Sequence, residues 1–363
     1  MTTISREAVE AALRESIDPH LQQDPLQAGC LRELQVQEGQ VQLQLVLPYP
    51  AGQFGPGWAR LLQERLERLP GVRQARVEVS WQVAAYPVPA QITALQGVRN
   101  VIAVASGKGG VGKSTTAVNL ALAMAMEGAM VGLLDADIYG PSLGLLCGVP
   151  EGTRPEVVGQ MLQPVQAHGL QLMSMAFLTD EQTPMVWRGP MASGALLQLI
   201  TQTAWQDLDY LIVDMPPGTG DIQLTLAQKV PVAGSLIVTT PQDLALLDAR
   251  KGIEMFARVN IPVLGVVENM AVHVCSNCGQ VEHLFGEGGG GKLAAFYGVE
   301  VLAALPLAMS IRQQSDAGVP VVQADPGGPV SALYRQLALN VGGRLARLQG
   351  QAPAVPSIEI SEE

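Results

Sequence analysis

The stretch "GKGGVGKS", residues 107–114, decides how this chain folds. It fits the pattern G-x-x-x-x-G-K-[ST], in which a glycine-rich loop turns successive backbone N–H groups toward phosphate oxygens. An apolar run precedes the loop, and a helix-length segment, "TTAVNLALAMAME" (115–127), follows it. In that context Lys113 is expected to neutralise the β- and γ-phosphates of a nucleotide, and Ser114 to bind Mg²⁺.

Short apolar runs alternate with helix-length segments on both sides of this loop. The runs are "VIAVA" (101–105), "MVGLL" (130–134), "YLIVD" (210–214), "SLIVTT" (235–240), "VLGVV" (263–267) and "VLAAL" (301–305). Runs without polar alternation are typical of strands buried on both faces, and their alternation with helices is typical of a doubly wound sheet. We therefore expect an α/β P-loop fold with a mostly parallel sheet.

The chain before this alternating region has a different pattern. Residues 1–83 predict a small α+β unit, because "LQVQEGQVQLQLVLP" (34–48) alternates with a period of two around a turn at Glu38-Gly39. Ser5 is expected to cap a first helix in which Val9, Ala12, Leu13 and Ile17 share one face.

The remaining domain boundaries follow from composition and from the positions of the prolines. Residues 84–97 contain two prolines and no clear period, which indicates a linker. The alternating α/β domain then runs over residues 98–350. The acidic, proline-containing residues 351–363 predict a disordered tail.

Composition also limits the function. The formal net charge of −11 argues against a nonspecific nucleic-acid binder, which needs a basic surface. No apolar run approaches the roughly 20 residues of a membrane span, and the start "MTTISREAVEA" lacks a signal-peptide pattern. Four cysteines in 363 residues do not make a disulfide scaffold. We expect a soluble, cytoplasmic protein that binds neither nucleic acid nor membrane.

Aspartates follow two of the apolar runs. Asp135 and Asp137 lie in "LLDAD" and Asp214 ends "YLIVD". Ligands of open α/β sheets bind beyond the carboxyl ends of the strands. These carboxylates are therefore expected to converge on Mg²⁺ and on the attacking water. A second glycine-rich stretch, "GEGGGGKL" (286–293), has Leu293 in place of Ser or Thr, and we expect a flexible loop there.

"HVCSNCGQ" (273–280) holds two of the four cysteines, Cys275 and Cys278. A C-x-x-C pair offers two thiolates, whereas zinc and iron–sulfur clusters usually need four ligands. The other two cysteines, Cys30 and Cys147, have apolar neighbours that indicate burial.

Lys108 adds a second lysine to the loop, and "KGGVGKS" resembles the deviant Walker A motif of ParA/MinD/nitrogenase-reductase ATPases. With "DADIYGPS", "VWRGPM", "DMPPGTGDIQLTLAQ", "TTPQD", "VENM", "CSNCG" and "FGEGGG", the chain resembles the Mrp/ApbC family of iron–sulfur cluster carrier ATPases. Residues 1–83 resemble, more thinly, the MIP18-type (DUF59) domain often fused to it.

The resemblance implies roles for single residues. Lys108 would act across a dimer, Asp137, with Asp135 beside it, would orient the hydrolytic water, and Asp214 would sense the γ-phosphate. Asn269 would read adenine and Pro306 would pack on the base. Arg188 would lie near the dimer interface, with a plain surface arginine stacked on Trp187 as the equal alternative. The residues implied around the nucleotide are Gly107, Lys108, Gly109, Gly110, Val111, Gly112, Lys113, Ser114, Thr115, Asn269 and Pro306.

A homodimer explains the two cysteines, because a two-fold axis doubles each residue near it. Cys275 and Cys278 of both subunits would then hold a [4Fe–4S] cluster. The resemblance implies ATP, Mg²⁺ and slow ATP hydrolysis coupled to transfer, with apo iron–sulfur proteins and a cluster-assembly scaffold as partners. Three alternatives remain open: a Cys₂His₂ zinc site with His273 and His283, a redox dithiol, and a structural pair that binds nothing.

Two other functions share this fold. An ATP-switched positioning protein of the ParA/MinD type would grip DNA or a membrane, which the acidic balance and the lack of a basic amphipathic helix disfavour. An electron-passing reductase like the nitrogenase iron protein would take its cysteines from two separated segments, whereas here both lie in one C-x-x-C.

Overall fold

A computed structural model describes residues 4–89, 91–178, 189–275 and 277–351. Arg188 and residues 352–363 of the predicted tail lie outside the described residues, and Gln351 is the last residue of a helix. Among the described residues, no helix is both long and apolar enough to cross a membrane.

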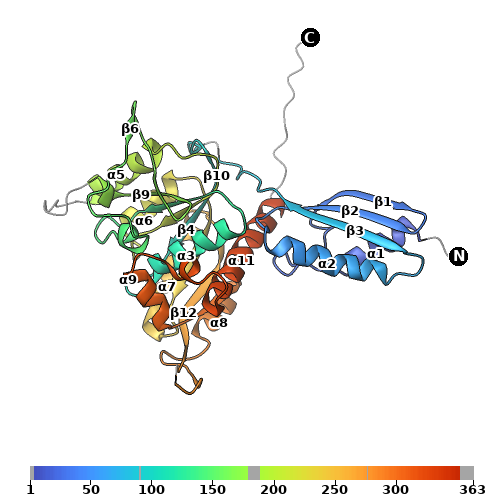
Figure 1. The fold of residues 1–363 in the computed structure, drawn as a ribbon. Coiled ribbons are helices and arrows are strands. Elements are labelled where there is room, and N and C mark those ends of the chain that lie inside the picture. The colour runs from blue at the N-terminus through green and yellow to red at the C-terminus, as the bar shows by residue number, and fades with distance from the viewer. Residues whose placement is uncertain (1–3, 90, 179–188, 276, 352–363) are drawn as a thin grey trace, which may run out of the picture.

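The N-terminal unit is a three-stranded sheet with helices on one face (Figure 1). Its elements are α1 (Arg6–Arg14), β1 (Leu31–Gln37), β2 (Gln40–Leu47), α2 (Phe54–Glu67) and β3 (Gln74–Trp81). β1 and β2 pair antiparallel across the expected turn, and β3 pairs parallel with β2. The period of two buries one face of β2, where Val41, Leu43 and Leu45 are each 1% exposed.

The first helix is shorter than the sequence predicts. Ser5 caps it as expected, since its hydroxyl accepts the Ala8 N–H at 3.2 Å. The helix ends at Arg14, however, and Ile17 is 52% exposed rather than packed on its face. Asp18 Oδ1 accepts the N–H groups of His20 and Leu21 at 2.8 and 2.9 Å, and this turn replaces the next helical turn.

The second unit contains one large sheet. Its strands are β4 (Val98–Ala105), β5 (Val131–Asp135), β8 (Val165–Ala167), β9 (Leu170–Ser174), β10 (Leu208–Asp214), β11 (Val232–Thr239), β12 (Val263–Val274), β13 (Val281–Glu282) and β14 (Val301–Pro306). The strand order is β13-β12-β11-β4-β10-β5-β9-β8, with β14 also paired to β12. Only β8 and β13 are antiparallel to their neighbours in the described sheet, so the predicted, mostly parallel α/β fold is confirmed.

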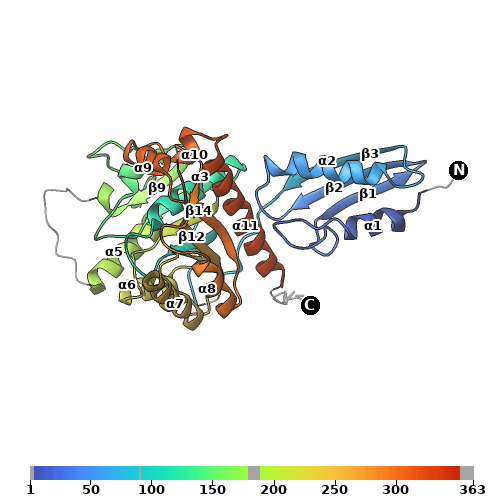
Figure 2. The same ribbon diagram turned by 90° about the horizontal axis from the view of Figure 1, so that it is seen from below.

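Helices cover both faces of this sheet (Figure 2). They are α3 (Lys113–Met126), α4 (Leu143–Leu146), α5 (Gly189–Gln202), α6 (Asp221–Lys229), α7 (Asp243–Arg258), α8 (Gly289–Tyr297), α9 (Met309–Asp316), α10 (Val321–Ala324) and α11 (Pro329–Gln351). Helices α3, α9 and α10 lie on one side, and α5 to α8 lie on the other. A 3-10 turn (Met175–Phe177) and a two-stranded ribbon, β6 (Val157–Val158) with β7 (Met161–Leu162), complete the unit.

The two units of the chain are in direct contact, and α11 lies between them in both views (Figures 1 and 2). Leu21 and Tyr49 of the N-terminal unit pack with Leu339 of α11 in one buried cluster. His20 Nδ1 lies 2.9 Å from Asn340 Oδ1, also in α11. The N-terminal unit therefore packs against the P-loop unit of its own chain.

Candidate nucleotide site and cysteine hairpin

The P-loop connects the end of β4 to the start of α3. Gly110 and Gly112 have φ values of 80° and 81°, which is the left-handed region that glycine tolerates best. A Cβ on Gly107 would lie 2.1 Å from the backbone carbonyl carbon of Asp248 in α7, so only glycine fits at this position. Gly109 and Gly110 are exposed, and glycine-rich loops of this kind can turn backbone N–H groups toward a phosphate.

Lys113 lies at the first position of α3 and is paired inside the protein. Its Nζ donates to Asp214 Oδ1 at 2.5 Å and to Ser114 Oγ at 3.2 Å. The side chains of Lys113 and Asp214 are 7% and 6% exposed. Burial raises the pKa of Asp214, and the Lys113 charge opposes that effect. The lysine, the hydroxyl and the carboxylate predicted to serve one nucleotide thus lie together.

Asp135 ends the strand beside Asp214, and the two residues are partners in the parallel register of β5 and β10. Its carboxylate accepts the N–H groups of Asp137, Ser142 and Leu143 at 3.0, 2.9 and 3.1 Å. Burial and the charge of Asp214 raise the pKa of Asp135 to about 7. Asp135 therefore holds the loop that follows it.

Asp137 itself lies in that loop, half-buried, and accepts the Gly140 N–H at 3.3 Å. The charge of Asp137 raises the pKa of Asp214. Lys108 and Thr115 are also half-buried beside the loop. The structure thus gathers these predicted residues around the loop, from the ends of β4, β5 and β10.

Asn269 reaches the P-loop from β12. Its Nδ2 donates to the Val111 carbonyl at 2.8 Å, and its side chain is buried. Pro306, at the end of β14, is half-buried and pairs in register with Val272 of β12. Asn269 is thus in direct contact with the loop, whereas Pro306 lies one strand further from it.

Sequence reasoning missed Glu268, which is buried and whose carboxylate accepts the Gly290 N–H at the start of α8. The signal was a single acidic residue inside the apolar run "VLGVVENM". The same contact explains why the expectation of a flexible loop at 286–293 is wrong from Gly289 onward, where α8 begins. Gly289 and Gly290 are buried in the first turn of α8, since a Cβ on either would lie 2.7 Å or less from a neighbouring atom.

Cys275 and Cys278 lie in the turn between β12 and β13, which projects from the body of the unit (Figure 1). Cys275 N donates to the Gln280 carbonyl at 2.9 Å, and Gly279 N donates to the Cys275 carbonyl at 2.8 Å. Cys278 is exposed and Cys275 half-buried. The N–H groups of Cys278 and Asn277 lower the pKa of Cys275, which favours the thiolate.

The other two cysteines differ in every respect. Cys30 and Cys147 are each 2% exposed, as expected, and burial raises the pKa of both thiols to about 12. Inert, protonated thiols of this kind are structural.

The two histidines of the segment do not join the cysteines. His273 Nδ1 lies 3.2 Å from the Leu307 carbonyl, and His283 Nδ1 lies 3.2 Å from the Ala271 carbonyl. Within the described residues, no three His, Cys, Asp or Glu side chains form a metal-binding group.

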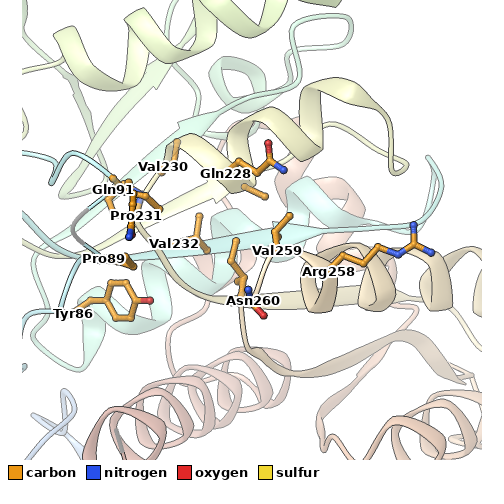
Figure 3. Close-up of a pocket in the computed structure, with 13 residues that line it drawn as sticks. Tyr86, Pro89, Gln91, Gln228, Val230, Pro231, Val232, Arg258, Val259 and Asn260 are labelled. Atoms are coloured by element: carbon orange, nitrogen blue, oxygen red, sulfur yellow. The ribbon is translucent and has the colours of Figure 1, made fainter. Parts of the chain in front are cut away.

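A separate cavity of about 360 Å³ lies at the end of the strands opposite to the P-loop (Figure 3). Tyr86 and Pro89 of the predicted linker form one wall, and Val232, Arg258 and Asn260 form part of the rest. Val232 is the first residue of β11, so the cavity lies at the amino ends of the strands. Parallel sheets bind ligands at the carboxyl ends, where the P-loop is.

Comparison with known proteins agrees with this geometry. A family model described as "NUBPL iron-transfer P-loop NTPase" matches residues 97–342, and one described as "Iron-sulfur cluster assembly protein" matches residues 6–79. An "Iron-sulfur cluster carrier protein" of Pseudomonas fragi is 69% identical over 283 residues, which cover 78% of this chain and 99% of that protein. The protein of the same name from Haemophilus influenzae is 44% identical over 100% of this chain and 97% of its own length.

A solved structure extends the likeness to three dimensions. The nucleotide-binding protein of Archaeoglobus fulgidus in complex with ADP superimposes with a TM-score of 0.57 at 38% identity, covering 65% of this chain and 91% of that one. Because the P-loop family model spans more than half of the chain, and relatives match over its length, this chain belongs to the family of NUBPL iron-transfer P-loop NTPases.

Proposed function

We propose that this protein is an ATP-hydrolysing carrier of iron–sulfur clusters. The observation that carries the proposal is the half-buried Cys275 and the exposed Cys278 in the turn that directly follows β12, the strand whose Asn269 contacts the P-loop. The pKa of Cys275 is lowered there. Thiolates are the ligands of such clusters. Two relatives, one of them matched over the whole of this chain, are named iron–sulfur cluster carrier proteins, which supports the same cargo here.

ATP would bind with its phosphates against the loop from Gly107 to Thr115 and with Lys113 at the β- and γ-phosphates. The Ser114 hydroxyl and the nearby carboxylate of Asp214 are oxygen donors of the type that Mg²⁺ prefers. With Mg²⁺ bound, charge on the γ-phosphate is neutralised. Asp137, with Asp135 beside it, would orient the water whose oxygen bonds to the γ-phosphorus as ADP leaves. Asn269 and Pro306 would border the base.

The cargo would be held between two copies of the chain. One turn supplies two thiolates, and two copies related by a two-fold axis supply the four that a [4Fe–4S] cluster takes. Lys108 would contact the nucleotide of the partner subunit, so that ATP favours the dimer. The cluster would come from an assembly scaffold and pass to apo-proteins by exchange of thiolate ligands, with no change of oxidation state.

We further propose that residues 1–83, the linker 84–97 and the carrier domain 98–350 are the working units of the chain. The first unit would orient the carrier or dock a partner, since its only cysteine is buried. We assign the activity to the cytoplasm, where thiols remain reduced.

Anaerobic reconstitution with iron and sulfide tests the cargo. The wild-type protein is expected to gain the visible absorption of a cluster and to elute as a dimer that contains about four iron atoms. Cys275→Ala should lose the iron and sulfide. Cys147→Ala, which removes a buried thiol, is the matched control and should keep both. One zinc ion per chain with no bound sulfide would overturn the assignment.

Removal of the P-loop lysine separates the two activities. Lys113→Ala should abolish ATP hydrolysis, because nothing else in the described loop places a buried cation beside Asp214, yet it should leave cluster binding by the reduced protein in place. Cys275→Ala should retain ATP hydrolysis. The proposal fails if Cys275→Ala leaves the iron and sulfide content unchanged.

A further inference from the structure

β12 is interrupted in its middle by a bulge. Between the pairs Glu268–Ala304 and Val272–Pro306, four steps along β12 are matched by two along β14. At the centre of the bulge Met270 has φ 58°, in the left-handed region. A residue other than glycine, asparagine or aspartate rarely adopts it, and such positions persist only where the surroundings hold them. Bulges of this kind often occur beside functional sites.

The amino-terminal side of the bulge is attached to the nucleotide site. Asn269 Nδ2 donates to the carbonyl of Val111 in the P-loop at 2.8 Å. A Cβ built on Gly112 would lie 2.2 Å from that same nitrogen and 3.8 Å from the methyl group of Met270. Glu268, one residue earlier, fixes the strand to the first turn of α8 through Gly290. Any movement of the P-loop at Val111 therefore reaches the bulge directly.

The carboxyl-terminal side is attached to the cysteine turn. The Val272 carbonyl accepts the Leu307 N–H at 2.8 Å, and the Ala271 carbonyl lies 3.2 Å from His283 Nδ1, on the far arm of the turn. His273 and Val274 then pair with Glu282 and Val281 of β13, directly before Cys275. Asn269 and Cys275 are only six positions apart, at most about 20 Å of extended chain.

We propose that the β12 bulge, residues 269–271, is the element through which the P-loop controls the position of the Cys275–Cys278 turn. Asn269 fixes the bulge to the P-loop on one side. On the other side β12 pairs with β13 as far as the cysteine turn, and the left-handed Met270 between the two sides is the joint. A shift of Val111 on nucleotide binding changes the angle at Met270, and the paired hairpin beyond it moves as a rigid arm. The inference deepens the proposed carrier function and rests on its nucleotide site and its thiols.

Thiol alkylation of the reduced, metal-free full-length protein tests this without any cluster. The rates at Cys275 and Cys278 are followed by mass spectrometry without nucleotide and with saturating Mg-ADP or Mg-ATP. In the wild type we expect nucleotide to change these rates about fivefold or more, the lower range of typical allosteric coupling. The buried thiols of Cys30 and Cys147 should not respond.

Two substitutions at Met270 separate the joint from general damage. Met270→Gly frees the backbone at this position and should reduce the nucleotide effect to less than about twofold. Met270→Asn favours the left-handed conformation and should retain most of the effect. The inference is overturned if Met270→Gly responds like the wild type, or if Met270→Asn loses the effect as completely as Met270→Gly.

Protection by the partner subunit is distinguished by repeating the series in Lys108→Ala, in which the ATP-dependent dimer is expected to be weakened. A nucleotide effect that disappears in this variant would assign the protection to dimer contact and overturn the inference. Failure of reconstitution with a preserved thiol response would instead reject the cluster cargo and leave the coupling intact.

Discussion

At the scale of single residues, the candidate nucleotide site contains three ionisable side chains that are almost fully buried: Lys113, Asp135 and Asp214. Lys113 neutralises Asp214, and Asp135 has three backbone N–H donors but no cation of its own among the interactions described. Burial therefore dominates the behaviour of Asp135 and raises its pKa from 3.8 to about 7. The carboxyl retains its proton in the folded protein at pH values where the unfolded chain has released it.

This shift predicts how stability depends on pH. Between about pH 4 and pH 7 the folded state binds one more proton at Asp135 than the unfolded state does. The free energy of unfolding therefore falls as pH rises, by up to about 1.4 kcal/mol per pH unit. Urea unfolding of the nucleotide-free protein from pH 5 to 7.5 measures this pH dependence. The free energy of unfolding of the wild type, relative to that of Asp135→Asn, should decline across this range. Asp207→Asn, at an exposed carboxyl, is the control, and a constant difference for Asp135→Asn would contradict the prediction.

At the scale of elements, local pattern was enough for most of the P-loop unit. The apolar runs are the strands β4, β5, β10, β11, β12 and β14, because strands buried on both faces need no information from elsewhere in the chain. The positions of the P-loop and of the aspartates at the strand ends could be predicted from the same short sequence patterns.

What local pattern missed depends on contacts between distant segments. Gly289 and Gly290 form a helix because Glu268 and Pro241 are close against them, and the left-handed Met270 requires anchors on the P-loop and on β14. Ile17 continues the spacing of a helix that the Asp18 turn has already ended. None of these contacts can be predicted from a short window of sequence, because each joins segments that are distant along the chain or depends on such a contact.

The junction between the P-loop and β12 gives a prediction with a built-in control. Gly110 and Gly112 both have φ near 80°, so alanine at either costs about 1–2 kcal/mol. Nothing lies within 4 Å of a Cβ at Gly110, whereas one at Gly112 would lie 2.2 Å from Asn269 Nδ2. Gly112→Ala must therefore also break the bond from Asn269 to Val111, at a further cost of about 1–3 kcal/mol.

Thermal unfolding without nucleotide compares the two variants. We expect a clearly larger loss for Gly112→Ala than for Gly110→Ala, and a loss in Gly112→Ala/Asn269→Ala that is smaller than the sum of the two single losses, since the clash is then relieved. Equal losses for the two alanines would show that the contact of Asn269 with the loop contributes nothing to stability.

At the scale of the whole molecule, one helix joins the nucleotide to the N-terminal unit. α3 begins at Lys113 and is capped by Glu127, about 21 Å away along a helix of this length. Glu127 is 1% exposed, and its Oε2 accepts the N–H groups of Gln53 and Phe54 at 2.9 and 3.1 Å, at the start of α2. Arg335 of α11 donates to Oε1 at 3.1 Å. In the sequence Glu127 is an ordinary glutamate at the end of a helix. Only the packing of the two units makes it a hydrogen-bond acceptor for both of them.

Glu127→Ala should therefore separate the two units without unfolding either. The substitution leaves the half-buried Arg335 charge and two N–H groups at the start of α2 without their acceptor, and polar groups that lose a partner in this way cost about 1–3 kcal/mol. Each unit has its own hydrophobic core, so the lost free energy weakens the contact between the units rather than the fold of either one.

Limited proteolysis with thermolysin, which cleaves beside apolar residues, should cut within residues 84–97 many times faster in Glu127→Ala than in the wild type. The exposed Glu151→Ala should leave that rate unchanged, because its side chain lies away from the interface. If the linker of Glu127→Ala were cleaved at the wild-type rate, the apolar contacts of Leu21, Tyr49 and Leu339 alone would hold the units together, and α3 would not connect the nucleotide to the N-terminal unit in any functional sense.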